Sequence, residues 1–422
     1  MEKTGDTNNE ELAEHLFRIE YGKIVAVIIK FLGVDHLKIA EDIAQETFYK
    51  AVKSWQHNGI PPNPKAWLYT TAKNECLNVL KKTKRQRNYK NEIRDSVLSH
   101  LESDNLVFTD QVISDEQLKM MFVCCHSSIS KVAQLSLMLK ILCGFSISEI
   151  ASALFTSKET INKRLVRARK KLKENKVSFT LPADIEREVP VIIQAIYLLF
   201  NEGYSPSEKD KLIRKELCFE AIRLAEILKH NPKVKNKGNC HALLSLMYLN
   251  ASRFDARLND SNEAVEMKNQ NRNQWNKPLI NKGIFYLNKG MESGMISIYH
   301  ILAAISANHC MAPDFEKTNW EEILSLYDSL LNLVDSPLIR LNRSVALSKV
   351  KGNSYAINEL DQLKSKTDIE EHYLFHSTIA EFHLEELDLE EATKHLNKAI
   401  SLAHNERDIK LFKKKLARIV PI

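Results

Sequence analysis

Glycine and proline are scarce in this sequence, with 11 of each in 422 residues. Tight β-turns depend on these two residues, and the alternation of β-branched and polar residues that marks half-buried strands is also rare. Stretches rich in alanine, leucine, glutamate and lysine, all good helix formers, take their place. The sequence therefore predicts an all-α protein. Its 422 residues suggest about two to four domains, and its 44% hydrophobic content is enough to give them buried cores.

Long apolar runs are also missing. The longest, Val191 to Phe200, is interrupted by Gln194 and is about half as long as a membrane-spanning helix needs to be. The seven cysteines are an odd number in a long chain, which does not suit a disulfide framework, and the charged N-terminus does not resemble a signal peptide. We therefore expect no membrane segment and a reducing, cytoplasmic location.

Positive charge is concentrated in two places, although the net charge is only +6. Residues 81–90 contain six basic residues and no acid, and residues 158–176 contain nine basic residues and two acids. Clustering of this kind points to a polyanionic partner more strongly than the total charge does.

The pattern of helices predicts three units, at residues 10–82, 111–176 and 183–422, with a polar linker at 83–110. In the first unit, apolar residues recur at helical spacing from Ile39 to Trp55 and leave an acidic edge on another face. A proline-rich loop follows, and Asn63 with Pro64 supplies an N-cap and a first-turn proline for the next helix.

The second unit has the layout of a helix-turn-helix. Ser146 with Glu149 forms a capping-box pattern, and Thr156 with Glu159 repeats it at the start of a strongly basic helix. A basic helix alone is more often simply solvated, but two capping boxes around a tight turn favour DNA binding. The residues expected to contact bases or phosphates are Lys158, Thr160, Asn162, Lys163, Arg164, Arg167 and Lys170.

Two further groups of residues allow more than one interpretation. Tyr69, Lys73 and Asn74 combine aromatic and polar groups suited to holding a single strand, although taken alone they are better explained as core aromatics beside a basic linker. Cys124, Cys125 and His126 suggest a metal or a catalytic site, but no second pair at zinc spacing and no nucleophile with a base are apparent. We therefore expect buried packing there, with no metal, cofactor or catalytic residue.

The C-terminal part contains an approximate repeat. Ser344, Ala356 and Leu360 are echoed, each 36 residues later, by Ala380, Ala392 and Leu396. This spacing is close to the tetratricopeptide period of about 34, which builds stacked helix pairs with a concave face for protein or peptide docking. A generic helical bundle is the alternative.

Taken in order, these elements resemble regions two and four of group-four, extracytoplasmic-function sigma factors. The matching stretches are residues 42–48, 67–74 and 160–168. Residues 122–126, 164–171, 196–204, 341–346 and 373–376 are similar to the subfamily with a tetratricopeptide-like C-terminal extension. Departures are Ser127, where the family usually has proline, and Asn269, Asn271 and Asn276, which replace acids and weaken any carboxylate metal site.

The resemblance implies core RNA polymerase, through the clamp helices of β′ and through β, and promoter DNA as partners. Asp42, Gln45, Glu46 and Phe48 would face the polymerase, Trp67, Tyr69, Lys73 and Asn74 would lie near the melted minus-ten element, and the second unit would read the minus-thirty-five element. The extension would control activity and could bind a further protein or peptide.

Two alternatives stay open at this point. A helix-turn-helix regulator with tetratricopeptide repeats that is not a sigma factor has no need of the acidic helix around Asp42. A Cys/His metal-dependent enzyme would need a set of groups around Cys124 that the sequence does not reveal.

Overall fold

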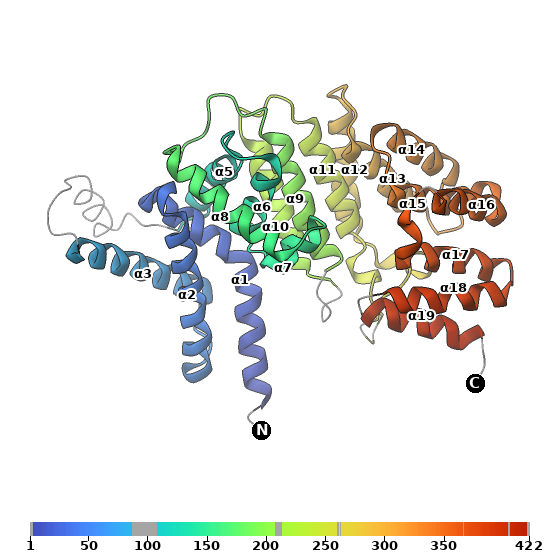
Figure 1. The fold of residues 1–422 in the computed structure, drawn as a ribbon, viewed down its shortest axis with the longest axis horizontal. Coiled ribbons are helices and arrows are strands. Elements are labelled where there is room, and N and C mark those ends of the chain that lie inside the picture. Colours follow the sequence, from blue (N-terminus) through green and yellow to red (C-terminus); the bar gives the residue numbers. More distant parts are fainter. Residues whose placement is uncertain are drawn as a thin grey trace. The chain divides into compact units, whose positions relative to one another are not determined.

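The computed structural model describes residues 3–86, 108–206, 213–259, 261, 263–365, 367–403 and 406–419. Regular structure in these residues is helical, apart from one isolated bridge between Leu258 and Ala264, so the prediction of an all-α protein is confirmed (Figure 1). None of the described helices combines the length and the apolar character that crossing a membrane requires. The chain forms two compact units, Met1–Gly203 with Glu216–Lys235, and Tyr204–Lys215 with Asn236–Ile422. We call them the first and second units.

The first unit begins with three helices and a short 3-10 turn. These are α1 (Lys3–Leu32), η1 (Val34–His36), α2 (Leu37–Asn58) and α3 (Pro64–Gln86). Large apolar side chains at their meeting point, such as Tyr21, Trp55 and Leu68, are almost fully buried. The predicted start of the third helix is confirmed, because the Asn63 Oδ1 accepts a hydrogen bond of 3.0 Å from the Ala66 N–H.

The next four helices are α5 (Asp110–Cys124), α6 (Lys131–Ile141), α7 (Ile147–Ala153) and α8 (Lys158–Glu174). The capping box of Ser146 and Glu149 is present at α7, as predicted. The second predicted box is wrong by one residue, because Ser157 and not Thr156 caps α8. The Thr156 N–H donates to the Ala151 carbonyl and so closes the end of α7, which leaves the extended residue Ser157 to accept from the Thr160 N–H.

The predicted linker at 83–110 lies mostly outside the described residues. At its two ends, α3 continues to Gln86 and α5 already begins at Asp110. Two more helices, α9 (Val189–Tyr204) and α10 (Lys215–His230), are largely part of the first unit. The Cys218 thiol of α10 lies 3.5 Å from the Phe200 carbonyl of α9, and the Arg223 guanidinium of α10 donates to the Gln117 side chain of α5.

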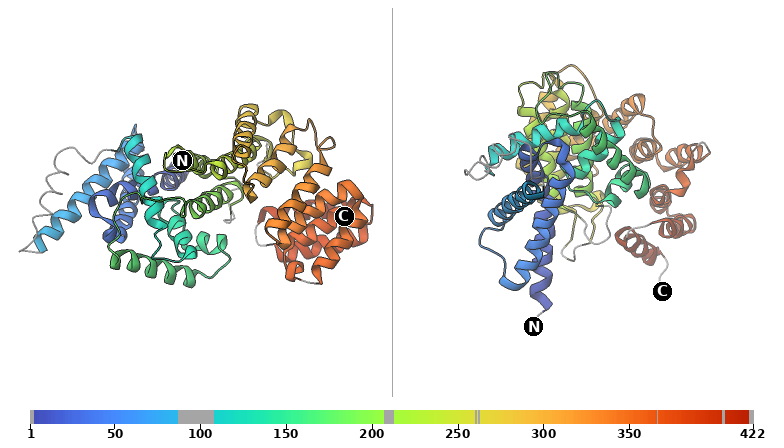
Figure 2. Two further views of the ribbon diagram at one scale, coloured as in Figure 1. Left: turned by 90° about the horizontal axis from the view of Figure 1, so that it is seen from above. Right: turned by 60° about the vertical axis from the view of Figure 1, so that its left-hand side comes forward.

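The second unit is a succession of helices that pack mainly on their neighbours along the chain. They are α11 (Gly238–Ala251), η2 (Phe254–Ala256), η3 (Met267–Asn269), η4 (Arg272–Gln274), α12 (Lys277–Met291), α13 (Ile298–Met311), α14 (Trp320–Leu333), α15 (Pro337–Lys351), α16 (Asn353–Lys364), η5 (Asp368–Glu371), α17 (Tyr373–Glu385), α18 (Leu389–Leu402) and α19 (Glu406–Ile419). Figure 2 shows the last of these, in orange and red, as paired helices lying side by side.

The 36-residue repeat predicted from the sequence is present as two helix pairs. The first helix of each pair begins at Pro337 and Tyr373, and the second at Asn353 and Leu389. The residues that defined the repeat are all buried, namely Ser344, Ala356, Leu360, Ala380, Ala392 and Leu396. Each helix pair needs small residues where its helices approach and leucines between them. Because these residues recur at matching positions of the two pairs, the 36-residue spacing is visible in the sequence.

Candidate nucleic-acid interface

Helix α8 has one apolar face and one basic face. Ile161, Leu165, Ala168 and Leu172 are buried and attach the helix to α6 and α7. The residues predicted to contact DNA lie on the rest of its surface: Lys158, Asn162, Lys163, Arg167 and Lys170 are exposed, and Thr160 and Arg164 are half-buried. The structure therefore brings all seven predicted contacts together on one helix.

The basic side chains of α8 are mostly available for a ligand. Lys163 pairs with Glu159 at 2.6 Å and Lys170 with Glu174 at 3.7 Å, and all four side chains are more than half exposed, where ion pairs contribute little. Lys158, Arg164 and Arg167 form no ion pair with any described residue. The Thr160 hydroxyl already has a hydrogen-bond partner, because it lies 2.8 Å from the hydroxyl of the capping residue Ser157.

Three of the four residues predicted to face the polymerase form an exposed patch on α2. Asp42 and Glu46 are about half exposed, and their ion pairs with described residues join them to lysines one turn away along the helix, at 2.7 and 4.0 Å. Gln45 between them is exposed. Phe48 is only 6% exposed, because its ring packs edge-on against Phe17 with centroids 5.0 Å apart. The Phe48 side chain is therefore part of the core.

The four residues predicted near the minus-ten element differ in exposure along α3. Asn74 is exposed, Lys73 is half-buried, and the half-buried Trp67 ring meets Trp55 edge-on at 5.6 Å. The Tyr69 ring is stacked on Phe108, with centroids 4.4 Å apart, and its hydroxyl donates to the fully buried Glu20 at 2.5 Å. Burial, and then the Glu20 carboxylate, raise the pKa of Tyr69 well above its usual value.

Ion pairs between α1–α2 and α5–α8 were not predicted. The Arg169 guanidinium of α8 donates to the Glu41 carboxylate of α2 at 2.8 Å, and the Glu41 side chain is 1% exposed. Arg18 of α1 binds Glu149 of α7 at 2.8 Å, again with a carboxylate that is 1% exposed. Both pairs join residues that are about 130 positions apart, as the separations of 128 and 131 show.

The Cys124-Cys125-His126 stretch forms the end of α5. Both thiols are buried, as predicted, and the Cys125 thiol contacts the Met138 sulfur at 3.3 Å. Burial raises the pKa of both thiols, which disfavours the thiolate that a metal or a substrate would need. Among the described residues, no three or more His, Cys, Asp or Glu side chains are placed to hold a metal ion. Asn276, one of the amides that replace acids, instead caps α12.

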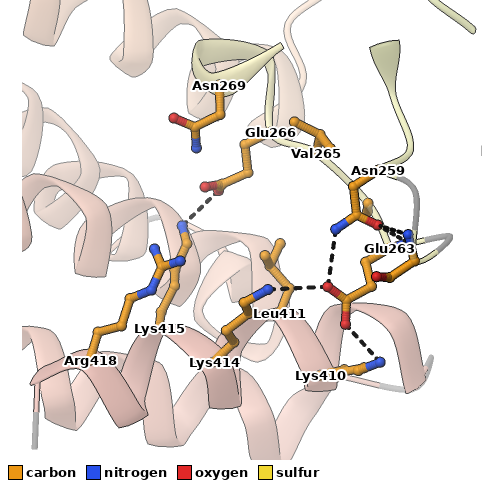
Figure 3. A pocket seen from close by; sticks show the side chains of 12 residues that line it. Asn259, Glu263, Val265, Glu266, Asn269, Lys410, Leu411, Lys414, Lys415 and Arg418 are labelled. Atoms are coloured by element: carbon orange, nitrogen blue, oxygen red, sulfur yellow. Dashed lines mark hydrogen bonds and ion pairs between the residues drawn. The ribbon is translucent and has the colours of Figure 1, made fainter. Parts of the chain in front are cut away.

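A cavity of about 260 Å³ lies in the second unit between residues 259–269 and α19. Figure 3 shows ion pairs across it, with Glu263 between Lys410 and Lys414 and with Glu266 bound to Lys415. The neighbouring lysines hold the pKa of Glu263 down at about 2. A carboxylate held ionised in this way is a poor general acid, so Glu263 does not suit that role in catalysis.

Three family models match successive parts of the chain. Residues 16–86 match the family model for sigma-70 region 2, residues 119–172 match that for sigma-70 region 4, and residues 188–291 match a family of unknown function (DUF6596). A protein of Rhizobium meliloti (strain 1021), described only as uncharacterized, is 31% identical over 334 residues, which cover 78% of each chain. No solved structure matches.

Proposed function

Because the chain belongs to the extracytoplasmic-function-like sigma factors and carries a C-terminal extension, we propose that it binds core RNA polymerase and directs initiation at specific promoters. In this proposal, the exposed patch of Asp42, Gln45 and Glu46 on α2 binds the clamp helices of the β′ subunit. Helix α3 lies along the melted minus-ten strand, and α8 enters the major groove at the minus-thirty-five element.

The observation that carries the proposal is the exposed basic face of α8, held by a capped helix-turn-helix in the same unit as a sigma region 2. Lys158, Arg164 and Arg167 would bind phosphates, and Asn162 lies near the N-terminal end of the helix, where side chains reach base edges. Region 2 or region 4 alone makes few contacts with DNA. Because the chain joins them, binding of one region raises the effective concentration of the other at its element.

Trp67 and Asn74 support the role of α3 more directly than Tyr69 does. Trp67 is half-buried and Asn74 is exposed, so both present groups to a strand lying along the helix. Tyr69 is stacked on Phe108 and bound to Glu20, so its part in the proposal is to fix α3 against α1. Phe48 likewise supports the α2 patch from beneath.

The test is binding to sigma-free core polymerase, measured by fluorescence anisotropy of the labelled chain. Replacing both Asp42 and Glu46 with lysine should weaken binding at least tenfold, because the exposed acidic patch becomes basic while the buried face of α2 is unchanged. The matched control reverses Glu174 and Glu316, which are exposed on α8 and near α14. Equal affinity of the patch variant and the control would exclude this patch and favour a DNA-binding regulator that is not a sigma factor.

A further inference from the structure

The cavity between residues 259–269 and α19 takes no part in the proposed binding of polymerase or DNA. Its volume of about 260 Å³ is close to the lower end of the range for small-molecule sites, about 300–1,000 Å³. One wall is the segment of short 3-10 turns that connects α11 to α12, and the other is the last helix, α19 (Figure 3). A cavity of this size suits a small organic molecule.

The first wall is held in place by its own contacts. Within the segment, the Val265 N–H donates a hydrogen bond of 2.8 Å to the Arg257 carbonyl. Toward its end, Trp275 is 3% exposed, and the Arg253 and Arg272 guanidinium groups lie 5.2 and 4.7 Å from the centre of the Trp275 ring. The segment is therefore ordered without a ligand, and a wall that needs no rearrangement lowers the cost of binding.

The second wall is one face of α19. On the other side of this helix, Phe412 is 5% exposed and packs with Leu396 of α18, which anchors α19 to its neighbour. Lys410, Lys414 and Arg418 recur every four residues, so they form one row along α19, and all three line the cavity. Like charges at this spacing repel one another, so the row is stabilised by negative charge beside it.

The cavity has more positive than negative charge. Four basic side chains and two acidic ones line it, namely Lys410, Lys414, Lys415, Arg418, Glu263 and Glu266. Glu263 binds Lys410 at 2.8 Å and Lys414 at 3.1 Å. Glu266 binds Lys415 at 2.6 Å. Arg418 is exposed and forms no ion pair with any residue that the structure describes, so it is the cation of the row that can accept an anionic ligand.

Arg418 lies at the end of the cavity away from Lys410, because the helix between them rises about 12 Å. Figure 3 shows Asn269 toward the same end, with Glu263 at the opposite end. The Asn269 side chain is exposed, and its amide can donate a hydrogen bond to an anion. Asn269 stands where the family resemblance predicts an acid, which would repel an anion. The asparagine therefore favours anion binding at this end.

We propose that this cavity binds a small organic acid, with its carboxylate between Arg418 and Asn269 and its apolar body against Val265 and Leu411. Both of these apolar side chains are half-buried in the lining. A carboxylate matches the planar guanidinium, which can donate two parallel hydrogen bonds to it. The inference goes beyond the proposed function and does not depend on it, because these residues lie outside the parts that match sigma regions 2 and 4.

The test is isothermal titration calorimetry of the full chain with straight-chain carboxylates from acetate to decanoate and with phenylacetate. At least one of the larger acids should show saturable one-to-one binding, about tenfold or more tighter than acetate, because it buries apolar surface. The matching neutral amide should bind about tenfold or more weakly, because it has no charge to pair with the guanidinium. No saturable binding by any acid, or equal binding of an acid and its amide, would overturn the proposal.

Two variants then locate the site. Arg418→Gln removes the cation and Asn269→Asp adds a carboxylate of the same shape, so each should weaken binding of the tightest acid by about tenfold or more. Both positions are exposed, so circular dichroism should show unchanged helix content. The matched control, Lys413→Gln, removes the same charge from an exposed position of α19 that does not line the cavity, and it should bind like the parent. Unchanged affinity in either variant, or an equal loss in the control, would refute this site.

Discussion

From the basic face of α8 we predict how strongly the affinity for promoter DNA depends on the salt concentration. Replacing Arg164, Arg167 and Lys170 with alanine removes three positive charges, two of which form no ion pair with described residues and one of which has a weak, exposed pair at 3.7 Å. Each phosphate contact contributes about 0.9 to the slope of log affinity against log salt concentration. The slope for promoter DNA should therefore become less negative by about 2.7 if all three residues contact phosphates.

A change of this size is easy to measure. The affinity advantage of the parent over the triple variant should shrink about sixfold for each doubling of the salt concentration. The assay is anisotropy of a labelled promoter duplex with the chain bound to core polymerase, between about 50 and 300 mM salt. The apolar face of α8 is untouched, so the fold should be retained.

The control removes the same charge elsewhere. Lys277, Lys289 and Lys317 are exposed in the second unit, and their replacement by alanine should leave the slope unchanged. An unaltered slope in the α8 variant, or equal changes in both variants, would show that α8 does not bind phosphates.

Three further predictions concern stability and reactivity. Burial, and then His376, lower the pKa of His395 to about 4 in the folded protein. Between about pH 6.5 and pH 4, His395 is therefore protonated in the unfolded chain but still neutral in the folded one. The free energy of unfolding of the second unit should decrease over that window by up to about 1.4 kcal/mol per pH unit from this residue, and denaturant titrations of His395→Asn should lack this component. Cys124 and Cys125 should react with a thiol reagent only after denaturation, and rapid reaction in the native protein would contradict their burial. Lys415→Ala should lower the free energy of unfolding by about 1–3 kcal/mol, because it removes the ion pair of the partly buried Glu266 and leaves Glu381 with Lys268 alone. The exposed Lys410→Ala should change it by less than about 1 kcal/mol, and equal effects in chemical denaturation would refute this difference.

Local signals predicted the elements of this protein well. The capping residues Asn63 and Ser146 marked two helix starts correctly, since a cap depends only on the few residues around it. Thr156 lies three residues before Glu159 and so fits the capping-box pattern, but Ser157 is an equally good cap, and the sequence does not show which of the two closes the preceding helix. The 36-residue repeat was visible because each copy packs on its neighbour in the same way.

Contacts between distant parts of the chain were not predictable in this way. The Glu41–Arg169 pair joins residues 128 positions apart, and neither residue differs in type from its exposed neighbours Asp42 and Lys170. Only the family resemblance placed Tyr69 near the minus-ten element, whereas the residues taken alone favoured a core aromatic, and its ring is stacked on Phe108.

The most direct test of the sigma-factor assignment is start-site-mapped transcription by purified, sigma-free core polymerase on fragments of the source genome, with and without the full chain. The account predicts discrete new start sites, each preceded by two shared elements about 25 base pairs apart, which spans about 85 Å of duplex. No new start sites, together with no binding to the core enzyme, would contradict it.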